Sequence, residues 1–166
     1  MRFEVTQHYP AAPEMVAEML TDDAYIERAA ADSGALRATH EVVPHDDGAF
    51  VISALRRLPT DTIPASLRSL VGSSIELRIV QAWSPASASG ARNATMTINI
   101  TGAPARCTAQ AQLRPDDPQA AMVTYAGEVQ VPIPLLGPSV EQTVVQAIKD
   151  GLATEHRAGL AHLAEG

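Results

Sequence analysis

The C-terminal segment from Ser139 to Ala164 places the strongest constraint on the fold. Apolar residues recur there at steps of three or four, with one histidine on the same stripe, which is the pattern of a long amphipathic helix: Val140, Val144, Ile148, Leu152, His156, Leu160 and Leu163. Such a helix spans roughly 39 Å at 1.5 Å per residue, so it can cross a whole sheet. Gly151 and Gly159 each cost up to about 1 kcal/mol relative to alanine, so we expect them to mark a bend or a close backbone contact.

Most of the remaining chain alternates apolar and polar residues with a period of two, which is typical of half-buried β-strands. The alternation predicts seven strands, at residues 2–9, 36–43, 50–58, 75–83, 94–100, 107–113 and 122–131. Asp46-Asp47-Gly48 lies between the second and third of these and predicts a hairpin, because Asp-Gly favours a tight turn.

Three short segments interrupt the strands. Pro13 is well placed in the first turn of a helix that continues to Leu20, and the side chains of Thr21-Asp22-Asp23 can cap a second short helix. Pro59 and Pro64 exclude a central strand between residues 59 and 72. The helical spacing of four apolar residues there predicts a loop with one or two helical turns: Ile63, Leu67, Leu70 and Val71.

This order of elements predicts an α+β fold in a single domain over residues 1–166. The economical arrangement is a helix-grip fold, in which a seven-stranded antiparallel sheet curls around one long C-terminal helix, with two short helices after the first strand. The first strand must then pair at the far side of the meander, because the two short helices separate it from the second strand.

Composition narrows the possible partners. Val, Ile, Leu and Phe supply 37 residues against 29 alanines, so the core is poor in large side chains. The net charge of −7 disfavours a nucleic acid and an anionic membrane surface as partners. A single cysteine, Cys107, excludes an internal disulfide and a cysteine-based metal site, and no other residue spacing indicates a metal or a cofactor. Without an apolar signal region or an apolar run of 18 residues, we expect a cytoplasmic protein with no integral membrane association.

Several residues carry a resemblance to a known superfamily. They are Leu58-Pro59 with Ile63-Pro64, Gly72, Trp83, and the stretch from Gly127 to Gly137 that leads into Val140-Glu141. The sequence resembles the START-like superfamily, also called SRPBCC, which includes the birch-pollen allergen fold, START lipid-transfer domains and polyketide cyclase-like proteins. It is most similar to an uncharacterised actinobacterial branch. The resemblance implies a cavity between helix and sheet that holds an apolar or amphipathic small molecule.

Small residues on two predicted strands point to the same cavity. Their inward faces would carry Cys107, Ala109, Ala111 and Leu113, and Val123, Tyr125, Gly127 and Val129. Interiors pack to a density of about 0.75, so small residues facing one helix leave a hole unless bulk comes from elsewhere. The alternative is a helix that lies closer to the sheet. An enclosed volume of roughly 300 Å³ or more would favour a ligand.

Candidate ligand-binding residues lie on the faces predicted to point inward. Gln7, Tyr9 and Tyr125 could orient a polar head group, and His40 and Arg56 could bind a carboxylate or polarise a carbonyl. Val144, Ile148 and Leu152 should close the cavity floor. The remaining candidates line the walls: Phe50, Ile79, Met96, Ala109, Ala111 and Gly127. The alternative for the polar residues is that they satisfy one another, with Arg56 paired to an acid and His40 hydrogen-bonded at an edge.

These patterns favour a carrier or sensor of a hydrophobic or amphipathic small molecule, such as a lipid, an isoprenoid or a polyketide, over an enzyme. The alternative is a cyclase, dehydratase or aromatase-like enzyme that uses the same cavity, with His40, Arg56 and Tyr125 as the candidates for proton transfer. A third possibility is a protein-interaction domain, which a core without voids would favour.

Overall fold

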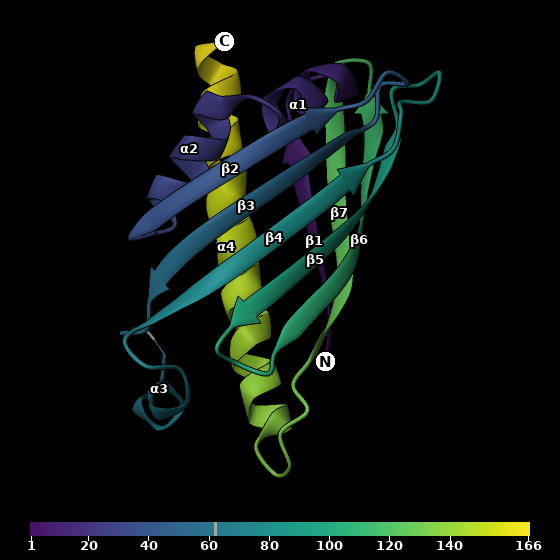
Figure 1. The fold of residues 1–166 in the computed structure, drawn as a ribbon. Helices are drawn as coiled ribbons and strands as arrows, with labels where there is room; N and C mark the ends of the chain where they lie inside the picture. Colours follow the sequence, from purple (N-terminus) through teal and green to yellow (C-terminus); the bar gives the residue numbers. More distant parts are fainter. Residues whose placement is uncertain (62) are drawn as a thin grey trace.

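The computed structural model describes residues 1–61 and 63–166. Seven strands and four helices follow one another along the chain (Figure 1). In order they are β1 (Arg2–Tyr9), α1 (Pro13–Leu20), α2 (Asp23–Asp32), β2 (Arg37–Pro44), β3 (Phe50–Pro59), α3 (Ala65–Val71), β4 (Ser74–Trp83), β5 (Arg92–Thr101), β6 (Arg106–Asp117), β7 (Ala120–Gln130) and α4 (Gly137–Glu165). The predicted elements are therefore confirmed, with boundaries that differ by a few residues.

The strands form one antiparallel sheet in the order β1-β7-β6-β5-β4-β3-β2. Strands β2 to β7 run as a meander, and β1 pairs with β7 over the register Arg2–Glu128 to Tyr9–Ala121. The first strand thus pairs at the far side of the meander, as predicted. Both β1 and β2 are edge strands.

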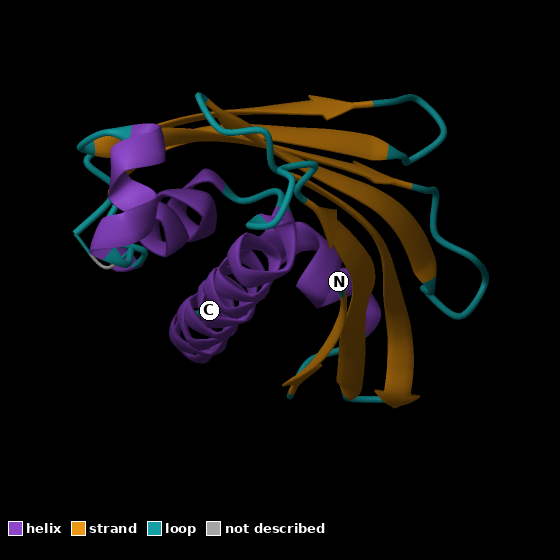
Figure 2. Cartoon of the chain, turned by 90° about the horizontal axis from the view of Figure 1, so that it is seen from below, coloured by secondary structure: helices purple, strands orange, loops and turns teal. Residues whose placement is uncertain are grey.

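The sheet curls around α4, which runs along its concave side (Figure 2). Helices α1 and α2 cover one end of that side, next to the C-terminal end of α4, and α3 lies at the opposite end (Figure 1). Helix α4 packs mainly against α2, β1 and β7. This is the helix-grip arrangement, and it leaves the concave side of β3, β4 and β5 without a helix packed closely along its whole length.

Local sequence explains how the short helices begin. The Asp22 side chain caps α2 by accepting a hydrogen bond from the Ala24 backbone N–H at 2.8 Å, as the Thr21-Asp22-Asp23 stretch predicts. Residues 65–71 form the helix predicted between Pro59 and Gly72. The side chains of Leu67 and Leu70, predicted to share a face of that helix, lie outside the described part of the structure.

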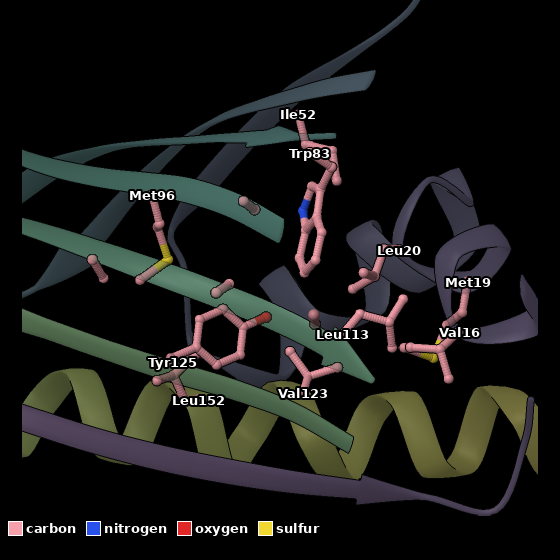
Figure 3. Close-up of a cluster of buried hydrophobic side chains, with 14 of the residues drawn as sticks. Val16, Met19, Leu20, Ile52, Trp83, Met96, Leu113, Val123, Tyr125 and Leu152 are labelled. Atoms are coloured by element: carbon pink, nitrogen blue, oxygen red, sulfur yellow. The ribbon is translucent and has the colours of Figure 1, made fainter. Parts of the chain in front are cut away.

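The densest part of the core lies where α1 and α2 cover the sheet. Figure 3 shows Trp83, Leu113, Val123 and Tyr125 of the sheet close to side chains of the helices, and all four are buried. The predicted inward faces of β6 and β7 are confirmed, because every one of those residues is buried except Gly127, which is half-buried.

Gly127 shows why one of these positions is small. A Cβ built at Gly127 would lie 2.6 Å from the Ala109 Cβ and 2.6 Å from the Thr108 carbonyl oxygen. The residue therefore lets β6 and β7 approach closely as the sheet coils, and no empty space is needed to explain it.

The C-terminal half of α4 is fixed to β1 by polar contacts. The Gln7 side-chain amide donates a hydrogen bond to the Leu152 carbonyl oxygen at 2.9 Å, and the Tyr9 hydroxyl donates one to Gln7 Oε1 at 3.0 Å. His156 Nε2 lies 2.7 Å from the carbonyl oxygen of His8. These contacts satisfy the polar groups of Gln7 and Tyr9 within the protein.

The two glycines within α4 differ in their surroundings. A Cβ at Gly159 would lie 2.9 Å from Tyr9 Cε1 and 3.0 Å from Met19 Sδ, whereas a Cβ at Gly151 would meet no atom within 4 Å. Gly159→Ala should therefore lower the free energy of unfolding by about 1 to 3 kcal/mol through overpacking. Gly151→Ala should raise it by up to about 1 kcal/mol through helix propensity. Urea denaturation of both variants checks the pair, and equal effects of the same sign would contradict it.

Candidate functional site

Aliphatic residues on the concave side of the sheet remain half-buried. The strand register places Leu77 opposite Ile100 and Ile79 opposite Ile98, so these side chains share the face that α4 crosses. We call this the aliphatic surface, and it comprises Ile75, Leu77, Ile79, Ile98 and Ile100, each of which is half-buried. Residues of this kind are usually fully buried when they face a helix across a sheet.

Helix α4 contributes a matching stripe. Val140, Val144 and Ile148 are half-buried and pack only partly against the core. Gly151 falls on the same side one turn further, and the space that its side chain would occupy is open. The N-terminal half of α4 and the aliphatic surface therefore present apolar side chains that no other described element covers completely.

A small inner cavity of about 40 Å³ lies between α2, α4 and the sheet. Its walls are mixed: the Arg56 guanidinium from β3 and the Glu155 carboxylate from α4 form an ion pair, with Arg56 Nη1 3.3 Å from Glu155 Oε1. Tyr25, Tyr125 and Ile79 also line the cavity. Arg56 and Glu155 are both largely shielded from solvent, with 10% and 19% of their side chains exposed.

The two tyrosines keep their protons at any physiological pH. Burial raises the pKa of Tyr25 and of Tyr125 well above the ordinary value, and the nearby Glu155 carboxylate raises both further. Neither hydroxyl has a hydrogen-bond partner among the described residues. Among those residues, no side-chain nitrogen or oxygen atom is both inaccessible to solvent and without a hydrogen-bond partner. Both tyrosines line the inner cavity, and both side chains are buried.

A second hollow of about 270 Å³ lies between α2 and the edge strand β2, and we call it the outer hollow. It shares three lining residues with the inner cavity, namely Ile26, Ala54 and Arg56. His40 lies on its wall, with its Nε2 2.7 Å from Asp23 Oδ1 at the start of α2. Arg56 thus stands in the wall common to both spaces.

A third hollow of about 530 Å³ opens where the β5–β6 connection meets the start of α4. Ile100 of the aliphatic surface is one of its lining residues, together with Val131 and Glu141. The aliphatic surface therefore runs from this opening to Ile79 at the inner cavity.

The structure brings some of the predicted site residues together and separates others. Arg56, Ile79 and Tyr125 line the inner cavity, while Arg56 and His40 line the outer hollow. Val144 and Ile148 are half-buried on α4. Ala109 and Gly127 line a further hollow of about 680 Å³ against β1. The rest lie within the packed sheet and helix contacts: Gln7, Tyr9, Phe50, Met96, Ala111 and Leu152.

The inner cavity is smaller than the predicted threshold of roughly 300 Å³ for an enclosed ligand site. Large side chains line it, among them Leu20 and Tyr25 from the short helices and Tyr125 from β7. The larger spaces are open ones, at the outer hollow, at the β5–β6 end and against strands β1, β6 and β7.

Sequence reasoning missed Glu155 as the partner of Arg56 and Tyr25 as a wall of the cavity. A signal for Glu155 was present, because residues 144, 148, 151 and 155 fall along one side of the helix and a carboxylate there interrupts an apolar stripe. Nothing in the local sequence of α2 separates Tyr25 from an ordinary core tyrosine.

The buried thiol of Cys107 offers a test of how tightly the concave wall is packed. Burial raises the pKa of the Cys107 thiol to about 11, above the value of about 8.5 for an exposed thiol. The folded protein thus holds this proton more tightly, so the stability it contributes is present below about pH 8.5 and is lost as the pH rises toward 11. Iodoacetamide at pH 8 should therefore alkylate the folded protein far more slowly than the urea-unfolded chain, as followed by mass spectrometry. Equal rates would contradict the prediction.

Among residues 1–61 and 63–166, no three histidine, cysteine or acidic side chains gather into a group that could hold a metal ion. Within the same residues, no helix combines the length and apolar character needed to cross a membrane.

Comparison with known proteins places the chain in a family. Residues 4–163 match the model of the family described as "Protein of unknown function (DUF2505)". The chain belongs to this family. No curated protein matches its sequence.

Solved structures with the same fold share little sequence with this DUF2505 chain. A START superfamily protein from Mycobacterium smegmatis is 14% identical, with a TM-score of 0.58 and 98% of each chain covered. The Zhui aromatase/cyclase from a Streptomyces species is 11% identical, with a TM-score of 0.58, 98% of this chain and 92% of that chain covered. The lipid transfer and protein localization domain of human StarD13 is 11% identical, with a TM-score of 0.58, 96% of this chain and 76% of that chain covered. The predicted START-like, helix-grip fold is thereby confirmed.

Proposed function

We propose that the protein binds a hydrophobic or amphipathic small molecule on the concave side of its sheet and acts as its carrier or sensor. The observation that carries this proposal is the aliphatic surface, which stays half-buried under α4 and leads to the buried Arg56–Glu155 pair. An apolar chain placed there would cover area worth about 25 cal/mol per Å². A polar end would meet the charged and hydroxyl groups at the inner cavity.

The likeness in fold supports the same class of ligand. The structures with which the chain shares its fold include a lipid transfer domain and an aromatase/cyclase, both named for small molecules or reactions on them. The identities of 11% carry no residue roles across. The ligand class proposed for this chain therefore rests on its own concave surface.

Binding without catalysis fits the placement of the three candidate proton-transfer groups. His40 lines the outer hollow, whereas Tyr125 lines the inner cavity, and only Arg56 reaches both. His40 and Tyr125 therefore do not face a common space in which one substrate could meet both. Because its pKa is raised by burial, Tyr125 also stays protonated at neutral pH and is unavailable as a general base.

Native purification followed by mass spectrometry of apolar extracts tests the proposal. Ile98→Gln places a polar group on the aliphatic surface, and Thr97→Gln is its matched control on the exposed opposite face of β5. We expect the unmodified chain and Thr97→Gln to retain the same small molecule and Ile98→Gln to lose most of it. Consistently empty protein, with no gain in melting temperature from acyl, sterol or polyketide probes, would overturn the proposal.

A further inference from the structure

We infer that the ligand carries a carboxylate and that Arg56 holds this group at the outer hollow between α2 and β2. The inference rests on the proposed function and names the chemical class of its ligand. It starts from the hydrogen-bonding capacity of one buried cation.

Arg56 has more donors than the structure uses. A guanidinium presents five N–H groups in a planar fork, and the described residues supply Arg56 with one contact, from Nη1 to Glu155 Oε1 at 3.3 Å. No side-chain nitrogen or oxygen atom among the described residues is both inaccessible to solvent and without a hydrogen-bond partner. The remaining donors of this 9% exposed residue therefore reach the spaces that it lines.

The outer hollow can receive an amphipathic anion. Its walls are mostly apolar, with Ile26 and Ala30 from α2 and Ala38 and Ala54 from the strands. Its ionisable lining residues are Glu27, Arg37, His40 and Arg56, so cationic groups outnumber acids. The imidazole of His40 is engaged with Asp23, which leaves Arg56 as the buried cation.

The register connects this hollow to the aliphatic surface. Ala38 lies opposite Arg56 across β2 and β3, Arg56 lies opposite Leu77, and Leu77 lies opposite Ile100. A head group at Arg56 can therefore continue into an apolar chain that crosses the sheet over Leu77 and Ile100.

A carboxylate fits these donors better than other head groups. Its two oxygens can accept parallel hydrogen bonds from one edge of the guanidinium, while Glu155 keeps the other edge. A hydroxyl head group accepts fewer hydrogen bonds than a carboxylate. It also brings no negative charge to the Arg56 guanidinium, which has only the Glu155 contact to neutralise it. A phosphate carries about two negative charges at pH 7, so the Glu155 carboxylate would repel it about twice as strongly as it repels a ligand carboxylate.

Titration calorimetry at pH 7.5 with decanoate and 1-decanol, two probes of equal chain length, tests the inference. We expect the unmodified chain to bind decanoate at least tenfold more tightly. Arg57→Met is the matched control, because Arg57 is the next residue on β3 and its side chain is 51% exposed. It should keep the tenfold preference. Because Arg56→Met alone leaves Glu155 unpaired, the decisive variant is Arg56→Met/Glu155→Leu, which should bind both probes equally.

The outcomes separate the two proposals. Equal binding of both probes by the unmodified chain, or a preference for decanoate that survives in Arg56→Met/Glu155→Leu, would overturn the carboxylate assignment and leave the proposed function standing. Failure of the unmodified chain to bind either probe would overturn the carboxylate assignment. The proposed function would fall with it only if the purified protein were also empty and gained no melting temperature from acyl, sterol or polyketide probes. Loss of the preference in Arg57→Met would also overturn the assignment, because it would place the anion on the outer face of β3.

Discussion

Arg56→Met is expected to lower the free energy of unfolding by about 3 kcal/mol, because it leaves the Glu155 carboxylate without its cation in a shielded site. The value is set at the lower end of the range for buried pairs because 19% of the Glu155 side chain stays exposed. Chemical denaturation at pH 7 measures the loss. A change below about 1 kcal/mol would show that the pair behaves as a surface ion pair.

The double variant Arg56→Met/Glu155→Leu provides the comparison. Replacing both charges with apolar side chains of similar size is often neutral or stabilising, because the cost of burying the charges disappears with them. We therefore expect the double variant to regain most of the stability that Arg56→Met loses. A double variant as unstable as the single one would mean that Arg56 acts through packing rather than through charge.

Leu152→Ala is expected to lower the free energy of unfolding by about 2 to 5 kcal/mol. Leu152 is 5% exposed, lies beside Tyr125 in the packed core (Figure 3) and is not among the residues that line the inner cavity. The full cost of a new void should therefore appear, and a ligand that binds the unmodified chain and the variant equally should leave the difference in stability between them unchanged.

Ile148→Ala is the matched comparison for Leu152→Ala, because Ile148 is half-buried on the same helix, one turn away from Leu152. It should cost less. Decanoate or 1-decanol should also narrow its difference in stability from the unmodified chain, because an apolar chain can occupy the space that the shorter side chain leaves and so binds the folded variant more tightly. Ligand rescue of Leu152→Ala but not of Ile148→Ala would move the binding surface away from β4 and β5.

The fold was predictable because each element carries its own periodicity. The alternation in residues 107–113 and 122–131 identified both the strands and their buried faces. Side chains alternate between the two faces of a strand, so shifting the strand by one residue would place every apolar side chain on the exposed face. The edge position of β1 followed from the two helices that separate it from β2. Residues 59–72 were the least certain, because their prolines exclude a strand without specifying where a helix begins.

The site was less predictable because it depends on distances between elements. The small side chains of Ala109 and Gly127 indicated a cavity. At Gly127, however, the missing side chain lets the backbones of β6 and β7 approach each other closely. Whether a space remained depended on how far Tyr25 and Leu20 reach from the short helices. The Arg56–Glu155 pair joins residues 99 positions apart, and no local pattern relates them.

The pairing of β1 with β7 has a consequence for how the chain folds during synthesis. Strand β1 leaves the ribosome before every other strand of the sheet, yet its partner ends at Gln130. Contacts of such high sequence separation form slowly because a long loop must close first. Until β7 emerges, the nascent chain exposes the backbone hydrogen-bonding edges of both β1 and β6, a period in which edge-to-edge association with other chains competes with folding.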